Sequence, residues 1–403
     1  KNTKNLKKEV VLKKIKPILE DPSIKKVGQN IKFDFIILKQ NNILINPIED
    51  TMLISYTLDA GRNRHNLDTL SEIHLSHKTI SYKELVGTGK NKLNFSDITL
   101  EKATEYAAED ADITLRLYNY LRTRLDEENL NKVYEVFEKP MVKLLSELEF
   151  NGIKVDDIYL KKLSKNFGEK LKKIEKKIYS IAGKEFNIAS PKQLGEIIYN
   201  ELKITKLKKT KKGSLATSAN ILEDLALGGH KFPNLVLEWR QISKLKNTYS
   251  DALQEHISKK TKRVHTSFLL AATNTGRLAS SDPNLQNIPI KSEEGKEIRK
   301  AFIAEKKNIL ISADYNQIEM RILSDMADVK ELKKAFKNNE DIHSLTASQV
   351  FNLPINEVNE DLRRKAKTIN FGIIYGITQY GLAKQISVSN QEALDFINAY
   401  FKK

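Results

Sequence analysis

One stretch near the C-terminal end constrains the interpretation of this chain most: residues 361–381, DLRRKAKTINFGIIYGITQYG. Steps of three and four residues return to the same side of a helix. At that spacing one face carries four side chains: Arg363, Lys367, Phe371 and, roughly, Tyr375. Cations bind phosphates, and an aromatic edge can hold a sugar or a base. The stretch therefore favours a nucleoside triphosphate site; the alternative is a basic amphipathic helix whose aromatic residues lie in the core.

The same stretch resembles a known motif. RRKAKTINFGIIYG is similar to the pattern RRxAKxxNFGxxYG on the nucleotide-binding helix of A-family DNA polymerases, the bacterial DNA polymerase I type. Every fixed position is filled. The resemblance implies that Arg363 and Lys367 bind the triphosphate of a dNTP, and that Lys367 is catalytic. It also implies that Phe371, near the sugar, and Tyr375 belong to the nucleotide-binding site.

Charge and composition narrow the class of protein. Lys and Arg outnumber Asp and Glu by 68 to 52 in 403 residues, and the formal charge of +16 favours a polyanionic partner, either nucleic acid or an acidic membrane. The absence of Cys excludes disulfides and thiolate zinc sites. No apolar run approaches the roughly 18 residues of a membrane span, and no signal-peptide pattern opens the chain. We expect a soluble intracellular protein; a start without Met and an end inside an apparent helix predict an internal fragment.

Two acids stand out in the N-terminal region. Residues 26–30 favour a short strand and a turn, and Asp34 follows among apolar neighbours. An acid there is costly to bury unless it is paired or binds a metal. Residues 100–121 predict a strong helix with Tyr106 and Asp110 four apart on one face. Taken alone, Asp110 could be a solvated helix acid.

These pieces also resemble the A-family polymerases. GQNIKFDF and YAAEDAD are similar to the second and third motifs of the 3′–5′ proofreading exonuclease domain. The resemblance implies that Asp34 and Asp110 ligate divalent metals, that Tyr106 orients the attacking water, and that Asn30 holds the substrate strand. Two-metal hydrolysis needs clustered carboxylates. The first exonuclease motif, an Asp-x-Glu pair on a strand, is absent from these residues.

The next part of the chain predicts helices from periodicity, caps and glycine stops. Together with one near the start, the expected helices span 9–19, 131–150, 156–182, a segment beginning at Ser190–Pro191, and 233–258. Gly152 should end the second of them. The only Trp, Trp239, is expected in the core.

A basic loop, KLKKTKKGS at residues 206–214, interrupts these helices. Loops of this kind usually are simply solvated. Given the resemblance, it looks like the tip of a polymerase thumb, which grips the duplex backbone without reading sequence. The candidate DNA-binding residues of the loop are Lys208, Lys209, Lys211 and Lys212.

Residues 263–272 alternate like a strand, and a loop rich in Gly, Asn, Ser and Pro follows them. The loop, TNTGRLASSDPNLQNIP at 273–289, resembles the family segment TGRLSSxxPNLQNIP, whose polar residues line the template–primer minor groove. The resemblance implies that Arg277, Gln286 and Asn287 bind DNA. Minor-groove acceptors are similar for every correct pair, so donors there can check shape without reading sequence.

Residues 308–313, NILISA, predict an apolar strand that ends at Asp314. DYNQIEMRIL then resembles the family motif DYSQIELR. An acid at the end of a buried strand can hold Mg²⁺ beside a triphosphate; the alternative for Asp314 is a helix N-cap. The resemblance implies a catalytic, metal-binding Asp314 with Tyr315 beside it. It also assigns Gln317 and Glu319 to the nucleotide site, with Glu319 as a steric gate against a ribose 2′-hydroxyl.

Further on, His343 fits the position at which the family's fingers touch the triphosphate, although alone it would more often be a surface histidine. The family's second catalytic Asp, in a His-Asp-Glu segment, is absent from these 403 residues.

The sequence thus predicts an α/β plus α+β multidomain chain. A partial ribonuclease H-like exonuclease domain at residues 1–126 should precede the thumb, part of the palm and part of the fingers at 127–403. The resemblance implies a DNA-directed DNA polymerase with proofreading, using two Mg²⁺ ions (Mn²⁺ possible). Its expected partners are primer–template DNA, dNTPs and single-stranded DNA. It should be a monomer in the cytoplasm, at the bacterial nucleoid. The chain by itself should be inactive. The alternatives are an exonuclease that only grips DNA with its polymerase half, or a non-catalytic nucleic-acid-binding protein.

Overall fold

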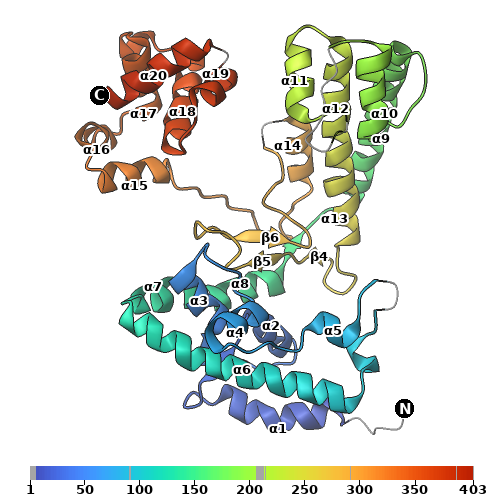
Figure 1. Ribbon diagram of the computed structural model, residues 1–403, viewed down its shortest axis with the longest axis vertical. Coiled ribbons are helices and arrows are strands. Elements are labelled where there is room, and N and C mark those ends of the chain that lie inside the picture. The colour runs from blue at the N-terminus through green and yellow to red at the C-terminus, as the bar shows by residue number, and fades with distance from the viewer. Residues whose placement is uncertain are drawn as a thin grey trace. The chain divides into compact units, whose positions relative to one another are not determined.

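The computed structural model describes residues 6–89, 92–205, 213, 215–290, 292–386 and 388–402. The chain forms two compact units, Lys1–Leu310 and Ile311–Lys403. Helices dominate both (Figure 1). Within the described stretches, no helix is both long enough and apolar enough to cross a membrane.

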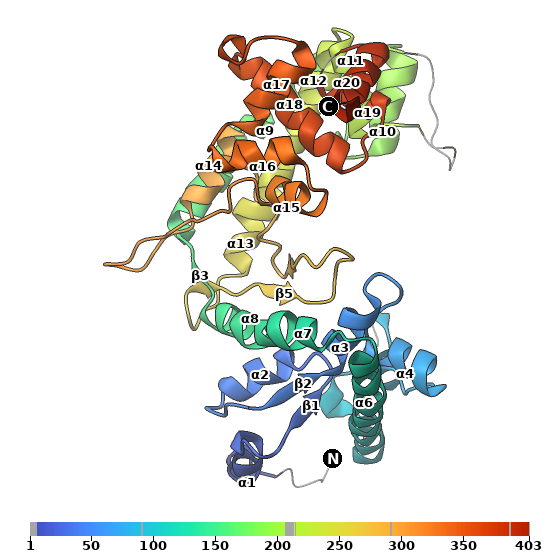
Figure 2. The same cartoon turned by 90° about the vertical axis from the view of Figure 1, so that its left-hand side faces the viewer.

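A parallel pair of short strands lies in the N-terminal region. β1 (Lys26–Gly28) pairs with β2 (Ile48–Asp50), with Val27 opposite Glu49. Parallel strands need a crossover connection, and α2 (Lys32–Lys39) lies in it. Figure 2 shows the pair between α2 and α6 (Leu100–Glu127). The strand and turn predicted at residues 26–30 are confirmed.

The helices of this region bury apolar stripes in a shared core. The buried apolar residues of α6 recur every four positions: Ile113, Leu117, Leu121 and Leu125. The helix predicted at 100–121 is confirmed and continues to Glu127. The other helices here are α1 (Lys8–Glu20), α3 (Thr51–Asp59), α4 (Leu67–Leu75) and α5 (Tyr82–Val86), with a 3₁₀ turn at Phe95–Asp97.

The predicted helix at 131–150 is present, with one irregular turn. It consists of α7 (Asn131–Val133), a π-helical turn (Tyr134–Glu138) and α8 (Lys139–Asn151). Gly152 ends it with φ of 60°. A Cβ on Gly152 would lie 2.5 Å from the Val264 carbonyl oxygen, so both the backbone angle and the space require glycine.

A helical bundle with its own core follows in the same unit. The predicted start at Ser190 is confirmed, since its side chain accepts from the backbone N–H of Gln193, and Asp156 caps α9 in the same way by accepting from that of Tyr159. Trp239 packs partly buried against the core, and its Nε1 donates to Glu175 at 2.9 Å. The bundle comprises α9 (Asp157–Ala182), α10 (Pro191–Glu196), α11 (Ala219–Leu227), α12 (Lys231–Leu245), α13 (Ala252–Glu255) and α14 (Glu293–Lys300), with π-helical turns at Ile197–Glu201 and Lys246–Asp251.

The strand predicted at 263–272 is two strands with different partners. β4 (Arg263–Val264) pairs with β3 (Ile153–Lys154), whereas β5 (Ser267–Leu269) pairs with β6 (Ala279–Ser281), both antiparallel. A change of partner needs a break in the strand. The prediction of one continuous strand is therefore wrong.

The second unit is helical and contains two small apolar clusters. One gathers around Ile369, Leu382 and Ile386, and the other around Met320 and Ile342. Its helices are α15 (Ile318–Met326), α16 (Lys330–Lys337), α17 (Ile342–Phe351), α18 (Glu360–Ile374), α19 (Gln379–Ile386) and α20 (Asn390–Lys402), with a 3₁₀ turn at Ile355–Glu357.

The apolar strand predicted at 308–313 is wrong, because these residues are irregular. Ile309 and Ile311 are 80% and 83% exposed. A strand needs a neighbour for its backbone hydrogen bonds, and no strand in the described part of the chain pairs with this one. Asp314 therefore does not end a buried strand. It is not a helix N-cap either, because Gln317 holds that position for α15.

Candidate functional site

The predicted stripe of cations and aromatics lies on α18. Asn359 caps this helix by accepting from the Leu362 backbone N–H at 2.9 Å, and acids occupy its first turn, where they suit the helix dipole. Because Arg363, Lys367 and Phe371 all lie within α18, their predicted helical spacing is confirmed. Tyr375 lies just after the helix and is exposed. Lys367 is exposed and Arg363 half-buried, so cationic groups reach the surface of this stripe.

Arg363 joins α18 to the start of α17. Its Nε donates to the carboxylate of Asp341. Asp341 in turn caps α17 by accepting from the His343 backbone N–H and the Ser344 hydroxyl, both at 3.0 Å. Burial acts to raise the pKa of Asp341, but the hydrogen bond from Arg363 holds it below its ordinary value. The pair therefore stays ionised and fixes the guanidinium beside α17.

His343 is buried between the two helices, contrary to the surface position typical of an isolated histidine. It is 2% exposed. Its ring centroid lies 5.9 Å from that of Phe371, at an interplanar angle of 50°. Burial lowers the pKa of His343; the cations Arg363 and Lys367 act in the same direction and Asp341 opposes them. The imidazole is therefore neutral at pH 7, at the side of a cationic stripe.

The residues predicted around the polymerase metal lie in the segment before α15 and in its first turn. Asp314 and Tyr315 are exposed in the irregular segment; Gln317, with φ of 54°, precedes α15, and Glu319 lies in its first turn. Among the described residues, no hydrogen bond or ion pair connects Asp314 or Tyr315 to the α18 stripe, and no group of three or more His, Asp and Glu side chains is arranged to hold a metal ion. Side-chain contacts join α17 to α18 through Arg363 with Asp341 and His343 with Phe371, and Met320 of α15 packs in one apolar cluster with Ile342 and Ile374 of these two helices.

The predicted exonuclease pair lies on α6. Tyr106 and Asp110 lie one turn apart on this helix. Desolvation, followed by the charge of Asp110, raises the pKa of Tyr106 to about 12, so the phenol keeps its proton. Desolvation also raises the pKa of Asp110. Asp34 lies on α2; its side chain keeps surface exposure, but desolvation by its surroundings still raises its pKa.

A buried acid that the sequence did not single out holds this region in shape. Asp50 is 1% exposed, and its carboxylate accepts from the backbone N–H groups of Asn30 and Ile31, each at 3.0 Å, and of Met52, at 2.9 Å. Asn30 has φ of 56°, a conformation that needs such support. Asp50 thus fixes the turn that carries Asn30 and leads into Asp34. The only sequence signal is an acid directly before the apolar helix TMLISYTL.

Asp50 should give the chain a characteristic pH dependence. Desolvation raises its pKa to about 6, above its ordinary value of 3.8, although its backbone hydrogen bonds oppose the shift. Between these values the folded state binds more protons than the unfolded state, so Asp50 makes the free energy of unfolding fall as pH rises from about 4 to 6, by roughly 3 kcal/mol at most. Urea unfolding of the wild type and of Asp50→Asn at pH 4, 5 and 6 measures this. Equal slopes in the two proteins would contradict the assignment.

The loop at 273–289 presents its three predicted DNA-binding residues, Arg277, Gln286 and Asn287, on the surface. Its beginning is closed by the Thr273 hydroxyl, which donates to the Arg277 carbonyl at 2.7 Å. Its end is held by the Tyr249 hydroxyl, which donates to the Asn287 carbonyl. The loop is therefore fixed at both ends while these side chains face solvent.

Tyr56, on α3, fastens the same loop to the N-terminal region. Its hydroxyl donates to the Thr273 carbonyl at 2.8 Å and accepts from the Gly276 backbone N–H at 3.1 Å. We call these two bonds the Tyr56 clasp. The Tyr56 ring also packs edge-on against His65, with centroids 5.5 Å apart. A residue far from the loop in sequence thus orders the backbone next to Arg277.

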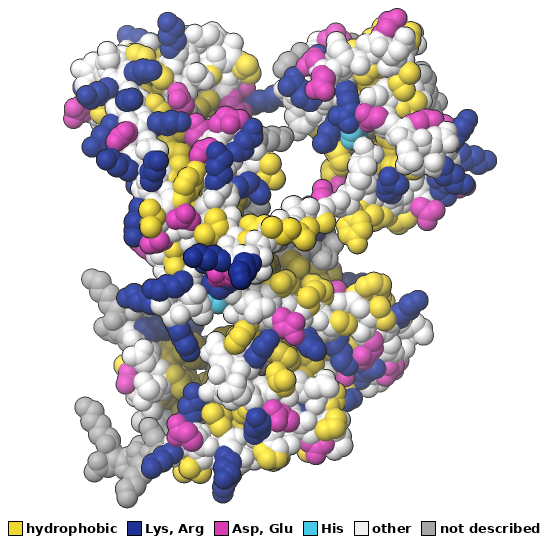
Figure 3. All heavy atoms as spheres, turned by 180° about the vertical axis from the view of Figure 1, so that it is seen from behind, with side chains coloured by type: hydrophobic (Ala, Val, Ile, Leu, Met, Phe, Trp, Pro, Cys, Tyr) yellow, Lys and Arg dark blue, Asp and Glu magenta, His cyan; other side chains and the backbone are white. Residues whose placement is uncertain are grey.

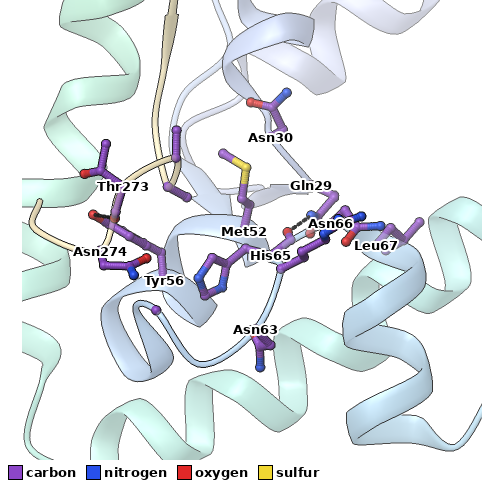
Figure 4. Close-up of a pocket in the computed structure, with 14 residues that line it drawn as sticks. Gln29, Asn30, Met52, Tyr56, Asn63, His65, Asn66, Leu67, Thr273 and Asn274 are labelled. Carbon is purple, nitrogen blue, oxygen red and sulfur yellow. Dashed lines mark hydrogen bonds between the residues drawn. The ribbon is translucent and has the colours of Figure 1, made fainter. Parts of the chain in front are cut away.

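The clasp borders a cavity of about 630 Å³. Figure 4 shows Asn30, Tyr56, His65, Thr273 and Asn274 around it, and Arg64 also lines it. Amide and cationic groups of this kind can bind the bases and phosphates of a nucleic acid. Asn30, one of the predicted exonuclease residues, is part of this lining.

Removing the clasp should loosen the loop without unfolding the chain. In Tyr56→Phe the Gly276 N–H loses its acceptor, at a net cost of about 1 kcal/mol, so its amide should exchange with solvent roughly fivefold faster. Hydrogen–deuterium exchange measures this. Tyr118→Phe is the control, since the Tyr118 hydroxyl bonds the exposed Lys25 amine, at 2.8 Å, and not the loop. Unchanged exchange at Gly276 would rule out the clasp as the constraint on this loop.

The predicted thumb-tip residues lie outside the described residues: Lys208, Lys209, Lys211 and Lys212. On the face drawn in Figure 3, Lys and Arg side chains are spread over the surface with fewer acids between them, in keeping with the charge of +16.

Comparison with known proteins defines the family. Residues 157–403 match the model of DNA polymerase family A, and residues 2–126 match that of 3′-5′ exonuclease. The chain belongs to DNA polymerase family A, and it combines an exonuclease domain with an A-family polymerase domain, as the sequence predicted.

Individual relatives are bacterial. The chain is 48% identical to DNA polymerase I of Rhizobium leguminosarum over 97% of its own length and 39% of the relative's. It is 44% identical to DNA polymerase I of Pseudomonas aeruginosa over 99% and 44% of the two chains. The solved POL domain of Pol1 from M. smegmatis, in complex with DNA primer-template and dNTP, superposes with a TM-score of 0.84 at 32% identity, over 99% of this chain and 67% of that one. The chain thus spans about two fifths of the length of the curated relatives it matches.

Proposed function

We propose that this chain is part of a DNA-directed DNA polymerase that adds dNTPs to a primer 3′-hydroxyl, with an associated 3′–5′ proofreading exonuclease divided from it at residues 126 and 127. The observation that carries the proposal is the α17–α18 arrangement, which gathers Arg363, His343 and Phe371 in a chain that matches DNA polymerase family A. The relative in complex with primer-template and dNTP supports the same substrates.

In this proposal the α18 stripe binds the incoming nucleotide. Arg363 and Lys367 offset the charge of the triphosphate as pyrophosphate leaves. Phe371 contacts the sugar, and Glu319 excludes a ribose 2′-hydroxyl. Gln317 and Tyr375 complete the pocket.

The residues present fit a divalent cation. The exposed carboxylate of Asp314 suits Mg²⁺, which proteins bind through one or two carboxylates together with waters and substrate phosphates. Tyr315 stands next to it. Asp34 and Asp110 would serve the exonuclease in the same way. Mg²⁺, or Mn²⁺ in its place, would stabilise the charge that develops on the reacting phosphate.

The surface of the first unit supplies the proposed DNA contacts. Arg277, Gln286 and Asn287 face solvent on a fixed loop, which suits minor-groove donors. The cavity beside Asn30 would take single-stranded DNA on its way to the exonuclease residues. We propose that the protein acts as a monomer at the bacterial nucleoid in the cytoplasm.

The test is primer extension by the full-length protein that contains this chain. Only the dNTP complementary to the template should be added. Lys367→Ala should reduce the efficiency of addition about 10- to 100-fold, because a charged hydrogen bond to phosphate is worth about 1.5–3 kcal/mol. Arg364→Ala is the matched control, since Arg364 is exposed and pairs with Asp361 on its own helix. Addition that ignores the template, or equal effects of the two variants, would refute the proposal.

A further inference from the structure

A chain of three buried polar side chains joins α17 to α18. The Thr346 hydroxyl donates to the Asn370 side-chain oxygen Oδ1 at 3.1 Å. The Asn370 side-chain nitrogen Nδ2 lies 3.1 Å from His343 Nδ1. Asn370 is 0% exposed, Thr346 6% and His343 2%. A fully buried amide is retained in a core only where its hydrogen bonds are satisfied, and here both ends are.

The chemistry of the amide fixes the protonation of the ring. In the structure the Thr346 hydroxyl donates to the Asn370 oxygen, and the amide presents its NH₂ group to the imidazole. An amide NH₂ can only donate, and His343 Nδ1 must therefore accept. In a neutral imidazole the proton then resides on Nε2.

We propose that Asn370 is a positioning residue that holds His343 in the tautomer protonated on Nε2, so that the ring presents a neutral hydrogen-bond donor to a triphosphate oxygen. The inference rests on the proposed function and deepens it. Neither Asn370 nor Thr346 reaches the surface, so both act through His343.

The surroundings favour a neutral ring. Burial lowers the pKa of His343, and the charges that face it from α18, Arg363 and Lys367, lower it further, while Asp341 on its own helix raises it. A third cation beside Arg363 and Lys367 would be repelled by both. A neutral N–H adds a directional contact to the phosphates without that cost. Phe371 packs against the ring and limits its rotation.

The opposite orientation of the amide is the clear alternative. The Asn370 oxygen would then accept from Nδ1–H, and the proton would leave Nε2. The two states differ in which ring nitrogen of His343 carries the proton. ¹⁵N–¹H correlation spectra of the 403-residue chain, labelled in histidine and recorded without ligand, distinguish them. We expect the Nε2–H pattern for His343 at pH 7.5. An Nδ1–H or doubly protonated pattern would overturn the proposal.

Two variants test the role of the chain of buried polar side chains. In Asn370→Asp the donor becomes an acceptor, so the proton should move to Nδ1 and the pKa of His343 should rise. Thr346→Val removes the group that orients the amide with little change of shape, and the two tautomers should mix. Asn398→Asp, which adds the same charge at an exposed position on α20, should leave the His343 spectrum unchanged. A His343 spectrum that is identical in all variants would overturn the role of Asn370.

Inorganic tripolyphosphate serves as the probe for the phosphate contact. Its addition should shift the Nε2 signal more than the Nδ1 signal. Thr346→Val should weaken its binding about twofold if half of the rings hold the wrong tautomer. A ligand-free Nε2–H tautomer that does not respond to tripolyphosphate would refute the phosphate contact of His343. The Lys367 experiment decides separately whether the wider nucleotide site exists.

Discussion

Asp314→Ala should abolish DNA synthesis by the full-length protein that contains this chain and leave 3′–5′ digestion intact. A bound metal ion contributes several kcal/mol to transition-state stabilisation, and each 1.4 kcal/mol or so is tenfold in rate, so a loss of about a thousandfold or more is expected. Primer extension and single-strand digestion on one preparation measure both activities. Asp325→Ala is the matched control, because Asp325 is an exposed acid on α15 that pairs with Lys333.

The reverse experiment uses an acid that we propose for the exonuclease. Asp110→Ala should stop digestion and spare synthesis, with Asp112→Ala as the control, since Asp112 is exposed and pairs only weakly with Arg116 at 3.5 Å. The two acids belong to different compact units, Lys1–Leu310 and Ile311–Lys403. Loss of both activities through either single change, in a folded protein, would contradict the assignment of two separate sites.

The largest effect on stability is expected at the buried ion pair between α2 and α8. Lys32 Nζ lies 2.5 Å from Glu149 Oε1, and the side chains are 9% and 8% exposed. The same oxygen accepts from the Phe268 backbone N–H at 2.7 Å. Glu149→Ala leaves the amine and the N–H buried without a partner, which should lower the free energy of unfolding by about 3–5 kcal/mol.

A double variant separates charge burial from packing. Replacing both partners, as Lys32→Met with Glu149→Leu, removes both charges and should recover most of the loss. Lys161→Ala breaks an exposed pair with Asp157 and should change stability little. Denaturant unfolding compares the wild type with Glu149→Ala, the double variant and Lys161→Ala. If Glu149→Ala costs no more than Lys161→Ala, the buried pair does not stabilise the fold.

The features that sequence predicted well depend on local spacing. The α18 stripe, the turn after β1 and the glycine at 152 each follow from helical periodicity or from a backbone angle that few residues adopt, so neighbours in sequence suffice to predict them. The strand predicted at 308–313 was wrong because apolar character says nothing about whether a partner strand lies alongside.

The features that sequence missed depend on residues distant in the chain. Asp50 and Asn370 matter through what they contact: two N–H groups some twenty residues upstream for Asp50, and a histidine on the preceding helix for Asn370. An isolated acid or amide carries no such information. A histidine considered without the family resemblance would be expected at the surface. The packing of α17 on α18 buries His343.

The Tyr56 clasp has a consequence for protein engineering. A designer who wants a polymerase without proofreading could simply delete residues 1–126. That truncation would also delete the hydroxyl that binds the Thr273 carbonyl and the Gly276 N–H. The shortened protein would keep Arg277 but lose the external support of its loop, whereas a point substitution at Asp110, the acid that we propose for digestion, would keep the clasp. Trimming this chain and substituting one residue of it are therefore different interventions, and only the second leaves the support of the loop at 273–289 intact.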